Sequence, residues 1–388
     1  MSGAAPVRRA SAMPPVPFLD LKAVNARFDA EMANAVGAVL ASGWYLLGEQ
    51  NRRFAAEFAR FCGSAHCVPL ANGLDALRLT LRAWMSFGRL QPGDEVIVPA
   101  NSFVASALAV TDSNLALRFA DVDAGTFCVT RDTIAASLTG RTRVVMPVHL
   151  FGQVDDIAAV RALCEDANVL VLEDAAQAHG ARFAGRHSGT FGDAGAFSFY
   201  PSKNLGALGD AGCMVTDDGE LAERVRMLGN YGSTRKYEHE HCGINSRMDE
   251  LQAAVLRIKL TRLDADNARR REIARRYNQR IAHPQVRTPR PPSEDSAHAW
   301  HLYVVRVPRR ASFIDHLNEH GIETMIHYPH AIHRQPAYRA AFSSVRMPVA
   351  EALQDEVLSL PMSPVMTDEQ VDRVVAAVNA WPGPSSSN

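Results

Sequence analysis

The sequence predicts an α/β fold: a large domain on a mixed, mostly parallel seven-stranded sheet, followed by a smaller C-terminal α/β domain. From about Ala65, short apolar runs alternate with helical stretches, and this pattern changes after the proline-rich segment 288–295. Continuous apolar strands that alternate with helices are typical of a sheet covered on both faces. A chain of 388 residues is also too long for one small core.

Two helices are predicted before the alternating region. Residues 18–43 have the periodicity of an amphipathic helix that ends at Gly43, and a second helix runs from Glu49 to Phe61 and closes on Gly63. The seven expected strands are 67–71, 95–100, 117–122, 144–150, 169–174, 195–200 and 213–216. Helices are expected between several of these strands, at 75–87 and 157–168 among others.

The C-terminal part begins within one long helical run, 249–281. A strand at 298–307 and a helix at 312–320 follow. The last helix runs to about Trp381, with Thr367 as N-cap and Gln370 completing a capping box. The domains expected are a disordered lead-in at 1–17, a large domain at 18–260, a smaller domain at 261–381 and a disordered tail at 382–388.

Composition excludes several classes of protein. A formal charge of −1 argues against nucleic acid or an anionic membrane as the main partner. No apolar run approaches the roughly 20 residues that cross a bilayer, and the N-terminus lacks the apolar core of a signal peptide. The six cysteines form no CxxC pair, so we expect reduced core thiols in a cytoplasmic protein rather than disulfides or a zinc site.

Lys203 is the strongest candidate for a chemical role. Lysine is scarce, and Lys203 follows an apolar strand and precedes a glycine-rich turn, at the sheet edge where α/β folds place ligands. A desolvated lysine amine forms Schiff bases with carbonyls, so we expect pyridoxal phosphate (PLP) there. The alternative is an ordinary surface lysine, which suits Lys22, Lys236 and Lys259 better.

Asp174 ends a strongly apolar strand, so its carboxylate must be paired or functional. A carboxylate facing a pyridine nitrogen keeps that nitrogen protonated and makes the ring an electron sink. Gln177, three residues on, is placed to reach the ring hydroxyl. The alternative is a helix N-cap aspartate beside a solvent-facing glutamine.

A phosphate site is predicted in LANGLDALRL, where a glycine between a strand and a helix offers free backbone N–H groups. The contacts expected are the amides of Gly73, Leu74 and Asp75, with the Asp75 carboxylate turned away. Ser198, five residues before Lys203, offers a hydroxyl to the same phosphate. A plain helix start and a core serine explain these residues equally well when each is taken alone.

Phe103 follows another strand and is a candidate to stack on the cofactor ring, although a core aromatic is the simpler interpretation of that residue alone. With these features, the segments EDAAQAHGA, SFYPSKNLGALGDAG and GINSRMDELQAAVLRIKL resemble the PLP-dependent sugar aminotransferases of the DegT/DnrJ/StrS family. The resemblance runs from about Phe18 to Val378 and implies the fold-type I architecture of aspartate aminotransferase.

The resemblance implies the same roles for Lys203, Asp174, Gln177, Ser198, Phe103 and the backbone of residues 73–75. It also implies that Asn245 reaches the phosphate of a neighbouring subunit, and hence a homodimer with two shared sites. Many relatives carry a hydroxyl residue in the phosphate cup where this chain has Leu74 and Asp75, so the resemblance implies no side-chain phosphate contact at these two positions.

The segments GLDAL and NYGSTRKYEHEHCGINSRMDE are similar to those of the family branch that makes 3-amino-3,6-dideoxy sugars. That branch implies transfer of an amino group from L-glutamate to a dTDP-3-keto-6-deoxyhexose, with Lys203 as general acid and base for the proton shift. A 4-keto sugar (perosamine-type) aminotransferase and a PLP-binding regulatory protein without turnover remain alternatives. Relatives that dehydrate sugars carry histidine where this chain has Lys203.

Candidates for the sugar and diphosphate contacts lie in two segments. They are Tyr231 and Arg247, together with His327 and His333 of HYPHAIHRQPAY. Arg247 is equally explained as a structural arginine at a helix start. The three-residue spacing of His327, His330 and His333 would suit a metal, but we expect loop residues that contact nucleotide or partner and no metal.

Overall fold

A seven-stranded sheet forms the centre of the large domain in the computed structural model, which describes residues 14–154, 156–235 and 237–383. The strand order is β1-β9-β8-β5-β4-β2-β3. β9 pairs antiparallel with both of its neighbours, and the remaining pairs are parallel, so the predicted sheet is confirmed. The strands are β1 (His66–Leu70), β2 (Glu95–Pro99), β3 (Ala116–Ala120), β4 (Thr142–Val145), β5 (Leu170–Asp174), β8 (Ala194–Ser198) and β9 (Gly212–Thr216).

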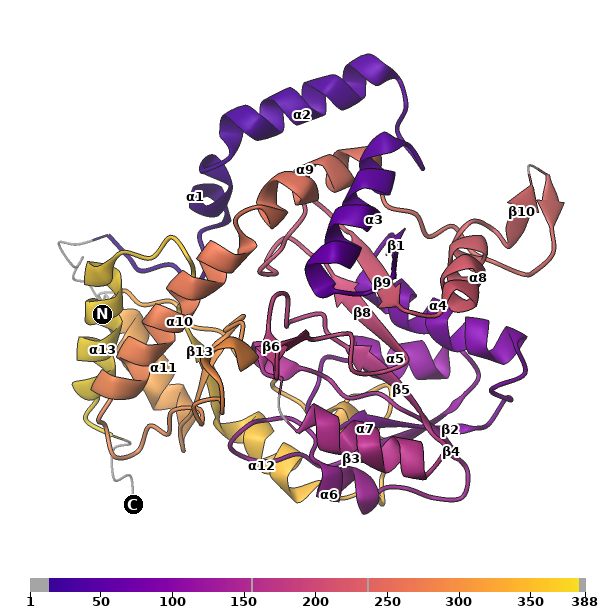
Figure 1. The fold of residues 1–388 in the computed structure, drawn as a ribbon. Helices are drawn as coiled ribbons and strands as arrows, with labels where there is room; N and C mark the ends of the chain where they lie inside the picture. Colours follow the sequence, from indigo (N-terminus) through magenta and orange to yellow (C-terminus); the bar gives the residue numbers. More distant parts are fainter. Residues whose placement is uncertain (1–13, 155, 236, 384–388) are drawn as a thin grey trace, which may run out of the picture.

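Helices cover both faces of this sheet (Figure 1). Successive strand residues point to opposite faces, so Val98 packs in the core under α4, α5 and α8 while Ile97 packs in a core on the other side. Phe58 of α3 and Phe197 of β8 belong to a third core on that other side, beneath α9. The helices are α1 (Leu21–Ala26), α2 (Asp29–Ser42), α3 (Glu49–Cys62), α4 (Gly73–Ser86), α5 (Ala105–Thr111), α6 (Arg131–Ala135), α7 (Ile157–Asp166), α8 (Gly219–Gly229) and α9 (Glu250–Leu260).

The C-terminal domain has a core of its own around Ile273, Tyr277 and Val374, and its strands β12 and β13 pair antiparallel. Its elements are α10 (Leu263–Arg280), β12 (Tyr303–Arg306), α11 (Arg310–Glu319), α12 (Pro348–Glu356), β13 (Val357–Leu360) and α13 (Asp368–Asn379). Two hairpins complete the strands: β6 (Arg182–Phe183) with β7 (Arg186–His187), and β10 (Ser233–Arg235) with β11 (Glu238–His239).

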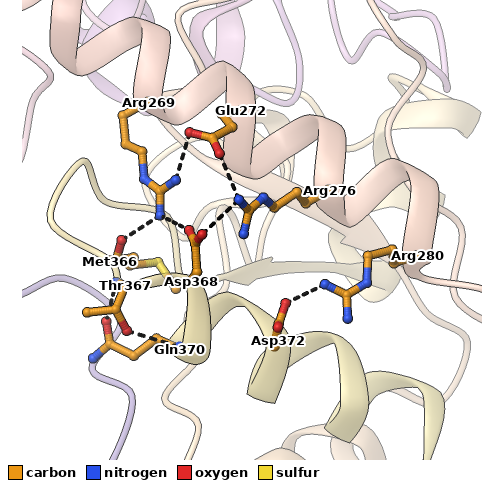
Figure 2. A network of polar contacts seen from close by, with 9 residues as sticks. All are labelled: Arg269, Glu272, Arg276, Arg280, Met366, Thr367, Asp368, Gln370 and Asp372. Atoms are coloured by element: carbon orange, nitrogen blue, oxygen red, sulfur yellow. Dashed lines mark hydrogen bonds and ion pairs between the residues drawn. The ribbon is translucent and has the colours of Figure 1, made fainter.

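Polar contacts join α13 to α10 (Figure 2). Arg269 and Arg276 both donate to Asp368, at 2.7 and 2.8 Å, and both also bond Glu272 on their own helix. The predicted capping box is present at the start of α13, with Thr367 and Gln370 bonding each other's backbone N–H. Surface ion pairs of this kind each contribute little, so the apolar core supplies most of the stability of this contact.

The N-terminal lead-in was expected to be disordered as far as residue 17, and this is wrong for its last residues. Val16 is fully buried in the C-terminal core and pairs with Ile322 in a parallel bridge. Its N–H donates to the Gly321 carbonyl at 2.8 Å. Residues 1–13 of the lead-in, and 384–388 of the expected tail, lie outside the described residues.

Two helices that the sequence predicts as continuous are interrupted. Residues 18–43 form α1 and α2, separated where Arg27 makes a two-pronged ion pair with Asp266 and Phe28 is buried against Val255. The run 249–281 forms α9 and α10, separated at 261–262, because Leu263 turns into the core beside Phe58. Both breaks depend on partners far away in the sequence.

Lys259 also differs from expectation, since it is a buried residue of α9 whose ammonium donates to the Gly206 carbonyl at 2.6 Å. Lys22 is exposed, and Lys236 lies outside the described residues. Five cysteines are buried and Cys242 is exposed, and none of the six forms a disulfide among the described residues. Within the described ranges, no helix combines the length and the apolar character needed to span a membrane.

Candidate active site

A cavity of about 500 Å³ lies at the carboxyl ends of the parallel strands. It receives residues that follow β1, β2, β4, β5 and β8, which is the sheet edge where open α/β folds bind ligands. Residues named from the sequence that line it are Gly73, Leu74, Phe103, Asp174, Gln177, Ser198, Lys203 and His327. Residues that the sequence reasoning did not name include Asn72, Tyr200, Ser202, His301 and Tyr328.

Lys203 sits in the turn after β8, where its backbone N–H donates to the Tyr200 carbonyl at 2.8 Å. Burial lowers the pKa of the Lys203 amine from 10.5 to about 8, and the nearby Asp174 carboxylate opposes that shift. The amine is therefore much closer to neutral at physiological pH than a lysine in water. A neutral amine is the form that attacks a carbonyl.

Asp174 ends β5 at the floor of the cavity and is almost completely buried. Burial raises the pKa of Asp174, while the Ser106 hydroxyl, donating to Oδ2 at 2.8 Å, and the Ala176 N–H, donating to Oδ1 at 3.2 Å, favour the ionised form. Because burial disfavours the ionised form of this carboxylate, a cationic partner in the cavity stabilises it, and the nearby Lys203 already acts in that direction.

Gln177 is held in a fixed orientation. Its Oε1 accepts from the Phe151 N–H at 2.7 Å, and its Nε2 donates to the Tyr328 hydroxyl at 3.0 Å. Since an amide nitrogen has two hydrogens, one N–H of Gln177 is left to face the cavity. Tyr328 comes from the C-terminal domain, so both domains fix this side chain.

The start of α4 approaches β8 closely, at Gly73 and Ser198. A methyl group on Gly73 would lie 2.7 Å from Ser198 Cβ, so only glycine fits. Gly73, Leu74 and Ser198 line the cavity together, at the positive, N-terminal end of α4.

The expectation that the Asp75 amide is free for phosphate is wrong. That N–H donates to Asn72 Oδ1 at 2.8 Å, which is an N-cap bond. The Asp75 carboxylate points to Arg78, at 2.6 Å, as expected for a group turned away from the site. The cradle therefore consists of Gly73, Leu74 and Ser198.

Phe103 and His327 lie at the mouth of the cavity. Phe103 is 54% exposed, and its ring is tilted against Tyr328 at a centroid distance of 5.5 Å. His327 Nδ1 contacts Ser359 Oγ at 2.8 Å, and burial together with Lys203 lowers the pKa of His327 to about 4. His327 therefore presents a neutral ring to the cavity.

The other candidates lie elsewhere in this chain. Tyr231, Arg247 and Asn245 do not line the cavity; the Arg247 guanidinium lies over the Tyr231 ring at 5.4 Å, and Asn245 is exposed. His333 is fully buried with Nε2 against Glu351 at 2.9 Å, so we no longer expect it to contact substrate. Among the described residues, no three His, Cys, Asp or Glu side chains are grouped to hold a metal ion.

Sequence reasoning missed Ser106, His301 and Tyr328. Ser106 lies on α5 and donates to Asp174, while His301 and Tyr328 line the cavity from the C-terminal part of the chain, so only the fold brings these three residues to the site. One contact could have been predicted from the sequence. Asn72 stands directly before a helix, where Asn is a preferred N-cap, so its side chain was a candidate partner for the Asp75 N–H.

The residues of the cavity fit pyridoxal phosphate. The glycine cradle and helix end suit a phosphate, buried Asp174 suits a protonated pyridine nitrogen, and the Lys203 amine has a lowered pKa suited to an aldehyde. The family model of the DegT/DnrJ/EryC1/StrS aminotransferase family matches residues 26–379. The chain belongs to this family.

Similar proteins come from several bacteria. The chain is 47% identical over 94% of its length to 99% of the dTDP-3-amino-3,6-dideoxy-alpha-D-galactopyranose transaminase of Aneurinibacillus thermoaerophilus. It is 45% identical over 94% of its length to 99% of the Saccharopolyspora erythraea protein EryC1, named an erythromycin biosynthesis sensory transduction protein. The crystal structure of S. venezuelae DesV with a ketimine intermediate superposes with a TM-score of 0.90 at 44% identity, over 95% of this chain and 99% of DesV.

Proposed function

We propose that this enzyme is a PLP-dependent aminotransferase that moves an amino group from L-glutamate to a nucleotide-linked keto-sugar. The sugar we propose is dTDP-3-keto-6-deoxyhexose, which gives dTDP-3-amino-3,6-dideoxyhexose. The observation that carries the proposal is one cavity holding Lys203, Asp174, Gln177 and the Gly73–Ser198 cradle. The activity in the name of the Aneurinibacillus relative, which is 47% identical, supports amination at C-3 rather than C-4.

Each residue of the cavity has a defined task in such a reaction. When bound, pyridoxal phosphate supplies an aldehyde and an electron-accepting ring. Gly73, Leu74 and Ser198 would bind its phosphate, Asp174 would hold a proton at the ring nitrogen, and Gln177 would donate its remaining N–H to the ring hydroxyl. The Lys203 amine would act as the general acid and base that moves a proton between carbons, and a pKa lowered to about 8 suits that role.

The substrate end of the cavity is proposed to lie toward Phe103, Tyr200, His327 and Tyr328. All four line the cavity, and Tyr200 is 55% exposed. Their rings and hydroxyl groups suit a sugar, which presents both apolar faces and hydroxyls. Burial keeps His327 neutral, so it can donate or accept a hydrogen bond without repelling a cation.

We also propose a homodimer with shared sites. Asn245, Tyr231 and Arg247 lie outside their own cavity, as expected for residues that serve a neighbouring subunit. The loop after α2 exposes a run of large apolar side chains, and α2 itself lies across the outside of α9 away from the sheet (Figure 1). That run is Trp44, Tyr45, Leu46 and Leu47. We expect the dimer to act in the cytoplasm, without nucleic acid or membrane as partner.

The test is an assay of purified protein with glutamate against dTDP-3-keto and against dTDP- or GDP-4-keto sugars, with the amine position fixed by NMR. We expect amination at C-3, and loss of turnover in Lys203→Ala. The exposed Lys22 gives the matched control, Lys22→Ala, which should turn over like the parent. Turnover by Lys203→Ala at the parent rate would refute the assignment, and product aminated only at C-4 would refute the subclass.

A regulatory function is the second candidate, because the EryC1 relative is named a sensory transduction protein. The visible absorbance of the bound cofactor separates the two functions. An aminotransferase loses the absorbance of its lysine-bound cofactor when glutamate is added. A protein that binds PLP but shows no such change with any amino donor would favour regulation.

A further inference from the structure

Asn267 of α10 is a fully buried polar residue that has no task in the reaction as described above. Its side chain is hydrogen-bonded to two segments that carry residues of the cavity. The Nδ2 atom donates to the His179 carbonyl at 2.8 Å, and Oδ1 accepts from Asn204 Nδ2 at 2.8 Å. Asn204 directly follows Lys203, and His179 lies two residues after Gln177. The amide therefore joins the segment of Lys203 to the segment of Gln177.

The orientation of the Asn267 amide is fixed by its partners. The His179 carbonyl can only accept, so the Asn267 atom that faces it is the nitrogen. Asn204 Nδ2 also donates to the Ala299 carbonyl at 2.8 Å, so both of its hydrogens are used. Gly180 approaches so closely that a methyl group on it would lie 2.7 Å from Asn267 Nδ2. The amide cannot turn away without leaving buried polar groups unpaired.

The sheet joins the two segments at the ends of their strands. The pairing of β5 with β8 reaches Asp174 and Ala196. Lys203 and Gln177 both lie past this point in the chain, where Asn267 bonds to the segment of each. Since α10 belongs to the smaller domain, a side chain of that domain connects the parts of the large domain that carry the site.

Asn204 is the anchor closest to the amine. The backbone N–H of Lys203 donates to the Tyr200 carbonyl at 2.8 Å, which closes the turn on its other side. Lys259 also holds this turn, but it bonds the Gly206 carbonyl, which is three residues further along. The bonds of Asn204 act directly beside the point where the Lys203 side chain leaves the backbone.

We propose that Asn267 is a positioning residue for Lys203. By joining the turn that carries the amine to the segment that carries Gln177, its amide holds the Lys203 side chain at a fixed place in the cavity. A proton transfer by one amine depends on such placement, because a displacement of about 1 Å can cost about 100-fold in rate. This inference rests on the proposed function, since only the chemistry of Lys203 gives the placement a purpose.

The test compares Asn267→Ala with the matched control Asn278→Ala. Asn278 lies on the same helix, accepts from the Tyr303 hydroxyl at 2.6 Å in the C-terminal core and does not line the cavity. Both variants lose a hydrogen-bonded asparagine of α10, and neither changes a charge. Both should therefore melt earlier than the parent, and only Asn267→Ala should affect Lys203.

The first readout is the pKa of the Lys203 amine in cofactor-free full-length protein, from its rate of chemical labelling against pH by mass spectrometry. Burial holds this pKa at about 8 in the parent. We expect it to rise by about one unit in Asn267→Ala, because the released turn exposes the amine to water, and to stay at the parent value in Asn278→Ala. Neither variant replaces the groups that interact electrostatically with the amine, which are Asp174, His179, His301 and His327.

The second readout separates kcat from KM in the holoenzyme. We expect kcat to fall about 10- to 100-fold in Asn267→Ala, while KM for glutamate changes by less than about three-fold. Misplacement of the amine slows the proton transfer and leaves the contacts of the substrate intact. In Asn278→Ala both constants should stay within about two-fold of the parent.

Asn204→Ala breaks the same bridge at its other end, and Asn204 is less buried than Asn267. The double variant should shift the labelling pKa of Lys203 no further than Asn204→Ala alone, because residues that act through one contact are not additive. Shifts that add would show that Asn267 does not act through Asn204, and the proposal would be wrong.

The proposal is also overturned if Asn267→Ala melts earlier but keeps the kcat and the Lys203 labelling pKa of the parent, because its role is then structural. If Asn267→Ala does not fold, an unchanged labelling pKa in Asn204→Ala overturns it instead. Failure of the parent to respond to glutamate would refute the proposed function, and the labelling of cofactor-free protein would still report on Asn267.

Discussion

Replacing Lys203 with methionine should make the cofactor-free protein more stable. Burial of the charged amine reduces the free energy of unfolding, and the same burial lowers the pKa of the amine from 10.5 to about 8. Methionine has a similar length and no charge, so it removes this cost without leaving a large cavity. The substitution at the same time removes the group that the proposed reaction needs, as expected where function and stability conflict.

The size of the effect follows from the two pKa values. At about 1.4 kcal/mol per pKa unit, the difference between 10.5 and about 8 corresponds to about 3 kcal/mol. Lys203 as a whole is only partly buried, so solvent reduces this figure, and we expect a gain of about 1–2 kcal/mol. For a chain of 388 residues the melting temperature should then rise by roughly 1–3 °C.

The pH dependence gives the sharper test. Below the folded pKa of about 8 the lysine is charged in the folded and the unfolded chain, and the cost is fully present. Above 10.5 the amine is neutral in both states, so the advantage of the variant should disappear as pH rises through this window.

The assay is urea unfolding of parent and variant without cofactor, at equal protein concentration, at several pH values from 7 to about 11. Lys22→Met is the control, since Lys22 is exposed and should give no gain at any pH. A Lys203→Met variant that is no more stable than the parent at pH 7, or whose gain persists above pH 10.5, would show that the amine is not desolvated as described.

Two further substitutions test the cradle and the loop before α3. Gly73→Ala should weaken PLP binding by about 5- to 100-fold in an absorbance titration, because the new methyl would lie 2.7 Å from Ser198 Cβ. The control is Gly37→Ala on α2, where the new methyl meets nothing within 4 Å, and this variant should bind PLP like the parent. Glu250→Gln should lower the free energy of unfolding by about 2–4 kcal/mol at pH 7, because the buried carboxylate accepts from Gly48, Gln50 and Asn51. Burial alone would raise the pKa of Glu250, but these hydrogen bonds outweigh it and lower the pKa below 4.5, so the difference from the parent should shrink as pH falls through that lowered pKa. Glu49→Gln, on an exposed neighbour paired with Arg52 and Arg53, is the control and should change the stability little; an equal loss of stability in both variants would contradict the role given to the hydrogen bonds of Glu250.

The strands of the sheet could be predicted because buried parallel strands are continuous apolar runs between turn residues. The helix breaks could not, since they depend on Asp266 meeting Arg27 and on Leu263 finding the core beside Phe58. Local periodicity contains no information about such distant partners.

The residues of the cavity also fall into those that local sequence could predict and those that depend on distant partners. Lys203, Asp174 and Ser198 were predictable, because polar residues directly after apolar strands collect at one edge of a parallel sheet. His301 and Tyr328, and Ser106 behind Asp174, were not predictable, because only tertiary packing brings them to the cavity or to that carboxylate. Asp75 was misjudged, although Asn72 showed that its amide would be capped.

The burial of Val16 attaches the start of the described chain to the core of the smaller C-terminal domain. The Pro14 carbonyl accepts from Arg373 of α13 at 2.7 Å, so the two ends of the described chain meet in one domain. The smaller domain is therefore not an independent C-terminal piece, since a fragment starting at α10 would lack part of its own core. We therefore expect the fold to tolerate circular permutation. A variant whose ends are joined by a short peptide, and whose new ends lie in an exposed turn, should keep every residue of the cavity in place.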